Sequence, residues 1–347
     1  MESGDYDPGP WKGYSFATAR KAYKSSVIDR SYDDAVDKDV KRDDLVPESI
    51  ETDSEAPVVV VCDVTGSMGE WPGVIFSKLP YLDIEGREYL GDTMQISFAA
   101  VGDGYSDRFP LQVSKFSAGK EMEAALKKLV IEGGGGGSSQ ESYDLAALYY
   151  ARNCKMPKAN KPIMIFIGDE GLYDFADKAT AEHWSRSALA QRMSMEEIFA
   201  ELKRKFAVYL VRKPYEAVSA NSLSPTDKRI QGQWEALLGE DHVSLLPSAD
   251  RVVDVIFGIF AKETNRIGYF KKELEHRQLP DAGGDKKVEM VMKSLNTIHA
   301  LPSPNTKGGK GKGKGGKSAG KSKKLPTGFS VTRKKPTGDE KDSISLI

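Results

Sequence analysis

The sequence predicts an α/β fold: an open, mostly parallel, doubly wound sheet with helices on both faces, followed by a disordered basic C-terminal tail. Between about residues 57 and 265, short apolar runs alternate with longer amphipathic segments. Such runs are typical of strands buried on both faces of a parallel sheet, and the segments between them have the length of right-handed crossover helices. After about residue 300 the chain is mostly Lys, Gly and Ser. This composition cannot bury a core.

Four apolar runs predict the parallel strands, at residues 58–62, 94–102, 163–168 and 207–211. The segment 108–116 alternates apolar and polar residues and contains Pro110. Proline lacks a backbone N–H and favours the edge of a sheet. We therefore expect this segment to form an antiparallel edge strand beside the second parallel strand.

Helical periodicity predicts four helices, at residues 120–132, 141–153, 194–206 and 250–260. The third begins with Ser194 and Glu197, which have the spacing of a capping box. The fourth places its apolar residues along one face, as expected for packing against the core. Pro72 and Gly73 make the segment after Trp71 a poor continuous helix, so we expect a loop there that adjusts to a partner.

Composition divides the chain into four parts. Residues 1–56 read as an extended N-terminal segment, 57–265 as the main domain, 266–300 as a helical extension and 301–347 as the disordered Lys/Gly-rich tail. The net charge of the chain is -1, but residues 306–347 hold twelve Lys or Arg against three Asp or Glu. Residues 1–305 are therefore acidic. The eight lysines between residues 307 and 324 are not interleaved with aromatic residues or arginines, so any binding to nucleic acid would be nonspecific and salt-sensitive.

The composition also excludes several classes of protein. No apolar run approaches a membrane span, and the polar start lacks the plan of a signal peptide, so we expect a cytoplasmic protein without a membrane partner. The chain has only two cysteines, Cys62 at the end of the valine run and Cys154 at the end of a predicted helix, which favours buried reduced thiols over a disulfide framework. The four histidines are scattered and have no metal-ligand spacing.

Oxygen-bearing side chains follow two of the predicted strands. Asp63, Thr65 and Ser67 occupy alternate positions directly after the first strand, and Asp169 follows residues 163–168. The carboxyl ends of parallel strands meet at one edge of the sheet, where ligands bind in doubly wound folds. Carboxylates and hydroxyls without a nearby His or thiol suit Mg2+, or Mn2+. Hydroxyls ligate weakly, so we expect an open position that a partner's carboxylate can fill.

This arrangement resembles a von Willebrand factor A (VWA) domain with its metal-ion-dependent adhesion site (MIDAS). The resemblance covers about residues 56–265. It implies that the D-x-T-x-S motif supplies the Asp63 carboxylate and the hydroxyls of Thr65 and Ser67, and that Asp169 supplies the later carboxylate. The family usually has serine at the first hydroxyl position. Taken singly, each segment is also compatible with an ordinary turn or helix cap, and it is their order along the chain that favours a metal site.

The middle motif departs from the family pattern. The threonine that usually follows a glycine pair is absent after the glycine run 133–137. By its spacing to the following helix, Glu141 is the first choice for this ligand, with Ser139 and Ser142 as substitutes. Such glycine-rich variants with an acidic residue resemble intracellular bacterial and phage-type members of the family. A carboxylate here would tighten metal binding and weaken the pull of the metal on an acidic partner.

The resemblance implies a non-catalytic, Mg2+-dependent protein-interaction (adaptor) module that receives an Asp or Glu of a partner protein. Intracellular relatives suggest a partner such as a MoxR-type AAA+ ATPase. The predicted rim of the site comprises Glu70, Trp71, Ser139, Ser142 and Glu170. Trp71 would serve there as an interface anchor, or else cover the end of the sheet.

The alternative function is enzymatic. The segments "CDVTGSM" and "IGDEGLYD" also resemble the phosphorylation loop and the metal motif of haloacid-dehalogenase-like phosphohydrolases. Asp63 would then be the nucleophile, and Asp169 and Asp174 would hold Mg2+. Three lysines are candidates for neutralising the phosphoryl charge: Lys155, Lys158 and Lys161. Against this reading, Val64 stands where that family has lysine, and the glycine run has no place in its pattern.

Overall fold

The computed structural model describes residues 41–298, except residues 70, 127, 132–133, 135–136, 216–222, 247 and 281. Most of the predicted N-terminal segment and all of the predicted disordered tail lie outside the described residues. Within the described part, no helix is long and apolar enough to cross a membrane.

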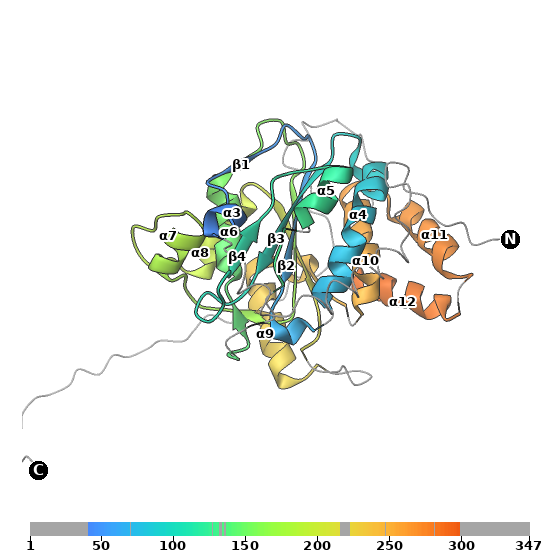
Figure 1. Ribbon diagram of the computed structural model, residues 1–347. Coiled ribbons are helices and arrows are strands. Elements are labelled where there is room, and N and C mark those ends of the chain that lie inside the picture. Colours follow the sequence, from blue (N-terminus) through green and yellow to red (C-terminus); the bar gives the residue numbers. More distant parts are fainter. Residues whose placement is uncertain are drawn as a thin grey trace, which may run out of the picture. The chain divides into compact units, whose positions relative to one another are not determined.

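A six-stranded sheet forms the centre of the fold (Figure 1). Its strands are β2 (Pro57–Asp63), β3 (Gln95–Val101), β4 (Leu111–Val113), β7 (Ile163–Gly168), β9 (Ala207–Arg212) and β10 (Val243–Leu245). They lie in the order β10-β9-β7-β2-β3-β4, and all pairs are parallel except β3 with β4. This is the doubly wound order, and it reverses direction between β2 and β7. The predicted α/β fold class is confirmed.

The predicted strands agree closely with the sheet. All four parallel strands are present, and the predicted edge strand is β4, antiparallel to β3. β10 was not predicted, because three residues are too few to show a pattern. Two small parallel pairs lie outside this sheet: β1 (Ile50–Glu51) with β6 (Cys154–Lys155), and β5 (Gln140–Glu141) with β8 (Gly171–Leu172).

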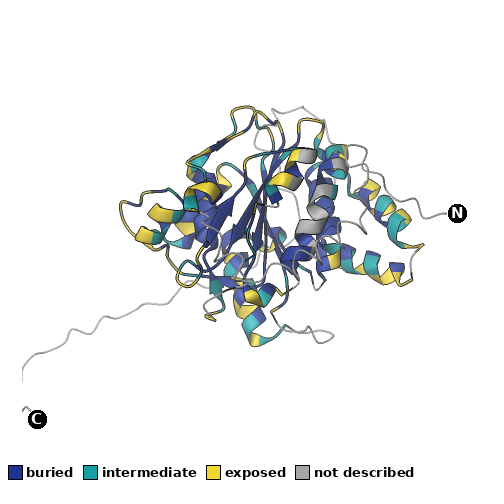
Figure 2. Cartoon of the chain, viewed as in Figure 1, coloured by how far each residue is buried: buried dark blue, intermediate teal, exposed yellow. Residues whose placement is uncertain are grey.

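Helices cover both faces of the sheet, and successive valines of β2 point to opposite sides. Val58 and Val60 pack in the core of the first face, with α4 (Trp71–Leu90), α5 (Lys120–Leu126), α10 (Val252–Glu263), α11 (Ile267–Gln278) and α12 (Gly284–Ser294). Val59 and Val61 pack in the core of the second face, with α3 (Arg42–Leu45), α6 (Tyr143–Asn153), α7 (Lys178–Trp184), α8 (Met195–Lys203) and α9 (Pro225–Leu238). Figure 2 shows the buried sheet between helices whose outer sides are exposed. This layering leaves the strand ends as the place for a site.

The helix predictions were correct in part. The Ser194 and Glu197 capping box is present at the start of α8. The prediction of a loop after Trp71 was wrong, because α4 runs continuously from Trp71 to Leu90. Pro72 is the second residue of this helix, and the first turn needs no N–H from proline. The predicted helix 120–132 is shorter than expected, since α5 ends at Leu126.

Three further short elements are 3-10 turns: η1 (Gly66–Met68), η2 (Glu240–His242) and η3 (Ala249–Arg251). Of these, η1 lies in the D-x-T-x-S loop, so it bears directly on the position of the predicted hydroxyl ligands.

An ion network joins the C-terminal helices to the rest of the core. Arg277 of α11 pairs with Glu85 of α4 and donates to the hydroxyl of Tyr81 at 2.9 Å. Its guanidinium also lies 3.6 Å from the carboxylate of Asp254 in α10. Burial raises the pKa of Glu85, while Arg277 opposes that shift. Arg277 therefore compensates carboxylates from two other helices.

Replacing Arg277 with Met is expected to lower the free energy of unfolding by about 2–3 kcal/mol, because the substitution leaves the partly buried carboxylate of Glu85 without its counter-ion. Urea denaturation followed by circular dichroism measures this change. Lys271→Met on the same helix is the control, because Lys271 is 54% exposed and pairs with Glu275 at 3.7 Å. That exposed pair should contribute less than about 1 kcal/mol. Equal effects of the two substitutions would contradict the assigned role of Arg277.

Candidate metal centre

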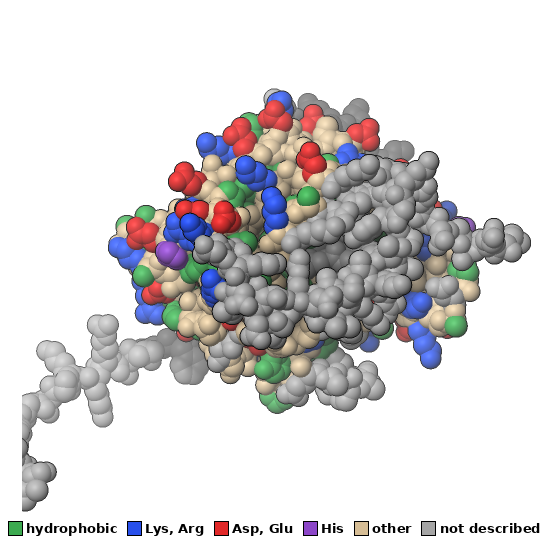
Figure 3. Space-filling view, in the orientation of Figure 1, with side chains coloured by type: hydrophobic (Ala, Val, Ile, Leu, Met, Phe, Trp, Pro, Cys, Tyr) green, Lys and Arg blue, Asp and Glu red, His purple; other side chains and the backbone are tan. Residues whose placement is uncertain are grey.

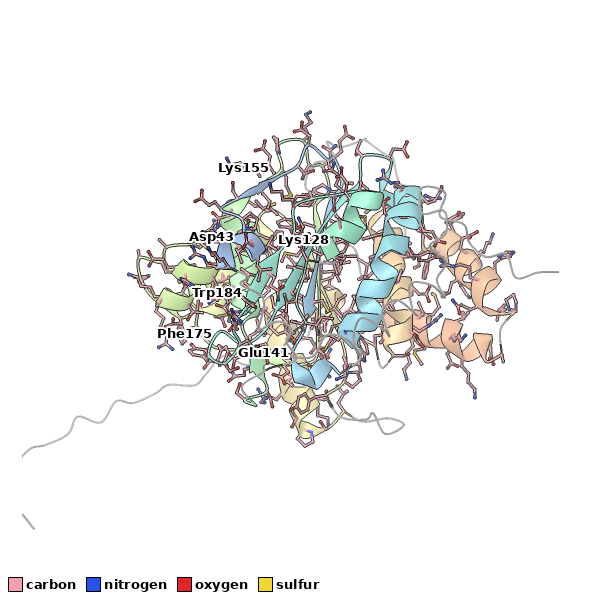
Figure 4. All side chains as sticks on the ribbon, viewed as in Figure 1. Asp43, Lys128, Glu141, Lys155, Phe175 and Trp184 are labelled. Atoms are coloured by element: carbon pink, nitrogen blue, oxygen red, sulfur yellow. The ribbon has the colours of Figure 1, made fainter. Side chains whose placement is uncertain are left out.

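The candidate site lies where the sheet order reverses. Asp63 is the last residue of β2, and Asp169 directly follows β7, the parallel neighbour of β2. Both side chains are completely buried. Figure 4 places Glu141 at this end of the sheet and Lys155 toward the opposite end. The two aspartates are about a hundred residues apart in the sequence, but they follow neighbouring strands at the same edge of the sheet.

A chain of hydrogen bonds connects the two aspartates through the D-x-T-x-S loop. Asp63 Oδ1 accepts from the backbone N–H of Thr65 at 2.9 Å and from its hydroxyl at 2.6 Å. The Thr65 and Ser67 hydroxyl oxygens are 3.2 Å apart, and Ser67 donates to Asp169 Oδ1 at 3.0 Å. The turn η1 brings Ser67 back toward β7. Ser67 is half-buried and Gly66 is exposed, so the site meets solvent at this loop.

Tyr143 holds the other oxygen of Asp63. Its hydroxyl donates to Asp63 Oδ2 at 2.5 Å, and its ring packs edge-on against Trp234. A Cβ at Gly168 would lie 2.1 Å from the Tyr143 oxygen, so the end of β7 needs glycine at this position. Tyr143 was not among the predicted site residues. Its place as the first residue of α6 is set by the packing of that helix, which no local motif signals.

Glu141 and Glu170 add two more carboxylates. Glu141 lies in β5 and is 1% exposed, and its Oε2 atom has no hydrogen-bond partner. The Glu170 carboxylate lies within hydrogen-bonding reach of Glu141 and of Ser67. The Trp234 indole N–H fixes the Glu170 backbone by donating to its carbonyl at 3.0 Å. A buried polar atom without a partner is costly, so a cation or a proton on the unpartnered oxygen of Glu141 would be stabilising.

The structure separates the three candidates for the middle ligand. Ser142 Oγ accepts from the backbone N–H of Gly104 at 2.9 Å, which engages it in the neighbouring loop. Ser139 has a left-handed backbone with φ 57°, and its carbonyl accepts from the N–H of Gly171. Only Glu141 of the three interacts electrostatically with Asp63.

One predicted rim residue, Trp71, lies in the core. Trp71 is 6% exposed and belongs to the core of the first face, so its prediction as an exposed interface anchor was wrong. Glu70 lies outside the described residues. Glu170, by contrast, belongs to the carboxylate cluster and is 5% exposed.

Burial and mutual repulsion favour the protonated forms of these carboxyls. Burial, followed by the charge of Asp169, raises the pKa of Asp63 to about 7. Burial and then Asp63 raise the pKa of Glu141 well above its usual range. Burial and then Asp169 raise the pKa of Glu170. A positive charge close by would oppose these shifts, so without one the cluster favours protonated carboxyls at neutral pH.

A lysine that the sequence analysis missed lies beside the aspartates. Lys213 follows directly after β9, and its Nζ donates to Asp169 Oδ2 at 2.8 Å and to the Ser67 carbonyl at 2.5 Å. It could have been found by examining the residue that leaves the next parallel strand, because strands β2, β7 and β9 are neighbours. Figure 3 shows acidic and basic side chains interspersed over the described part of the visible face.

The lysines predicted for the enzymatic reading do not reach the site. Lys158 pairs with Asp53 at 2.9 Å, and Lys161 pairs with Glu263. Lys155 is exposed in β6, toward the opposite end of the sheet (Figure 4). All three precede β7, so they lie near its amino end, and their predicted role was wrong. Asp174, the second predicted metal ligand of that reading, is exposed.

The donor set suits a hard cation only if hydroxyls take part. Among the described residues, no three His, Cys, Asp or Glu side chains are arranged to hold a metal by themselves. The hydroxyls of Thr65 and Ser67 would have to complete the coordination, together with the unpartnered oxygen of Glu141. Mg2+ accepts such oxygen sets and usually keeps several waters.

Comparison with known proteins gives structural likeness only. The sequence matches no protein-family model and no curated protein sequence. Among solved structures, the pilus adhesin SpaC from Lactobacillus rhamnosus GG is 13% identical, with a TM-score of 0.43, over 64% of this chain and 32% of the adhesin. Proximal thread matrix protein 1 from the mussel byssus is 13% identical, with a TM-score of 0.41, over 62% of this chain and 49% of that protein. The chain thus spans a third to a half of these proteins, and the likeness carries no argument about its function.

Proposed function

We propose that this chain is a Mg2+-dependent protein-interaction module of the VWA type, with a MIDAS-like site that receives an Asp or Glu of a partner protein. The observation that carries the proposal is the hydrogen-bonded path from Asp63 through Thr65 and Ser67 to Asp169 at the switch point of the sheet. Glu141 supplies the middle ligand through its unpartnered oxygen.

Each residue of the site has a role in this proposal. Thr65 and Tyr143 orient the two oxygens of Asp63, and Ser67 and Lys213 orient those of Asp169. The cation, when bound, offsets the buried negative charge and presents an open position to a carboxylate. Mn2+ can replace Mg2+, because both prefer oxygen ligands.

The proposed setting follows from the resemblance. We propose a cytoplasmic adaptor whose partner is a protein such as a MoxR-type AAA+ ATPase, without catalytic activity of its own. Affinity purification with and without a chelator, followed by mass spectrometry, tests this setting. Proteins that elute with EDTA would be the candidates, and the same proteins retained equally in EDTA would argue against metal-dependent recognition.

Metal binding itself gives the direct test. We expect the full chain to bind Mn2+ in the electron paramagnetic resonance assay, and Mg2+ to displace it, because each of the carboxylates of Asp63, Glu141, Asp169 and Glu170 interacts with two of the others. Binding to a single site should raise the melting temperature by mass action. A chain that binds neither ion at neutral pH would overturn the proposal.

A haloacid-dehalogenase-like phosphohydrolase is the second candidate, and Lys213 is the observation in its favour. An ammonium beside Asp169 could neutralise a phosphoryl group. Against this function, Thr65 and Tyr143 engage both oxygens of the required nucleophile, Asp63. Hydrolysis of p-nitrophenyl phosphate with Mg2+ decides the matter. We expect no turnover above that of Asp63→Asn, whereas turnover abolished by this substitution would favour the enzyme.

A further inference from the structure

Lys213 places a positive charge at the candidate metal centre. Its Nζ contacts Asp169 Oδ2 and the Ser67 carbonyl, and its side chain is 19% exposed. An ammonium has three N–H donors. Two are used here, and the described residues give no protein acceptor for the third. Lys213 therefore combines a fixed position beside the cluster with a donor that remains available.

The charge balance of the site makes this lysine important. Asp63, Glu141, Asp169 and Glu170 can contribute four negative charges, and the ammonium of Lys213 contacts one of these carboxylates, at Asp169 Oδ2. A divalent cation would leave the ionised cluster negative even with Lys213 present. An acidic partner group approaching such a site meets repulsion, and loss of Lys213 would increase it.

We propose that Lys213 is the specificity-determining residue of this site, which admits an acidic partner by donating to the carboxylate that enters the open position of the metal. This inference rests on the proposed function. Ser67 joins the two halves of the arrangement, since its hydroxyl belongs to the metal-binding set and its carbonyl holds the Lys213 ammonium. The metal and the third N–H of Lys213 can then contact the same incoming carboxylate at the half-buried Ser67.

Lys213 has the opposite effect on the metal. Its positive charge repels a cation bound at Asp63 and Asp169, and its bond to Asp169 Oδ2 withdraws part of that carboxylate's charge. Lys213 thus lowers the affinity of the site for the metal and raises its affinity for a partner's carboxylate. One substitution at this position should therefore move the two affinities in opposite directions.

The test uses Lys213→Met in the full chain, with two probes. Mn2+ binding is measured by electron paramagnetic resonance. Binding of an Asp-containing tripeptide with blocked termini to the Mn2+-loaded protein is measured by water-proton relaxation, because a carboxylate that displaces a metal-bound water lowers the relaxivity. We expect Mn2+ to bind about tenfold more tightly and the tripeptide about tenfold more weakly than in the wild type.

Two variants serve as controls. Lys213→Arg keeps the charge and should remain close to the wild type in both measurements. Lys158→Met removes one positive charge from the far end of the sheet, where Lys158 is 62% exposed, and should change neither affinity. Circular dichroism of each variant checks the fold, and the gain in Mn2+ affinity would itself exclude a misfolded Lys213→Met site.

The outcomes separate this inference from the function on which it rests. Wild-type protein that binds no Mn2+ would overturn both. Wild type that binds Mn2+ and the tripeptide, with both affinities unchanged or both lowered in Lys213→Met, would overturn the role of Lys213 alone. Wild type that binds Mn2+ but prefers inorganic phosphate to the tripeptide, or binds the Asn counterpart equally well, would also reject a carboxylate-selecting Lys213.

Discussion

Asp63→Asn is expected to lower the affinity for Mn2+ and Mg2+ by about a hundredfold or more while leaving the fold intact. Asp63 is central to the cluster. Its oxygens accept hydrogen bonds from Thr65 and Tyr143, and its carboxylate interacts electrostatically with that of Asp169. Asparagine has nearly the same shape and keeps one oxygen to accept from Thr65. The substitution therefore removes the negative charge with little change in packing. Isothermal titration calorimetry with Mg2+ measures the loss.

A matched control distinguishes metal ligation from the general effect of a buried carboxyl. Asp144 is 5% exposed at the start of α6, and burial raises its pKa to about 7, as it does for Asp63. The charge that adds to this shift is that of Asp177, which is outside the carboxylate cluster. Asp144→Asn should therefore preserve Mg2+ affinity, whereas both variants should stabilise the metal-free protein near pH 8. Equal Mg2+ affinity in Asp63→Asn and the wild type would rule out the proposed ligand set.

The parts of the fold that the sequence predicted are those with local causes. β2 and β7 are continuous apolar runs because both faces of each strand are covered. Their residues alone therefore predict the strands. α4 was missed because Pro72 was weighed as a helix breaker, although its effect depends on its position in the helix. β10 is too short for any pattern, and its pairing with β9 is a consequence of the sheet order.

The site shows the same division. Asp63 and Asp169 could be predicted to meet, because each leaves a strand at its carboxyl end and neighbouring strands are parallel. No motif predicts the positions of Lys213 and Tyr143 at the site. The position of Lys213 depends on β9 lying next to β7, and that of Tyr143 depends on the direction in which α6 begins. Trp71 was misplaced for a related reason: its environment is set by helix α4, which the sequence analysis did not predict.

Without metal, the protein is expected to lose stability as the pH rises from about 4 to about 7. The pKa of Asp63 is about 7 in the folded protein against an ordinary value of 3.8, so between these values the folded state holds a proton that the unfolded state has released. Stability from this group is fully present below about pH 4 and is lost as the pH passes through about 7. The shift corresponds to a free energy on the order of 4 kcal/mol. Glu141, Glu170 and Asp144, whose pKa values are also raised, act in the same direction.

Metal binding should reverse this trend, because a cation competes with protons for the same oxygens and replaces them most readily when they are already lost. The rise in melting temperature caused by Mg2+ is therefore expected to be small near pH 5 and large near pH 8, and Asp63→Asn should flatten both the metal-free profile and the metal response. Differential scanning calorimetry in EDTA and in Mg2+ measures both. A response to Mg2+ that is independent of pH, or largest in acid, would mean that the cation binds somewhere other than these buried carboxyls, since no protons would be exchanged for it there.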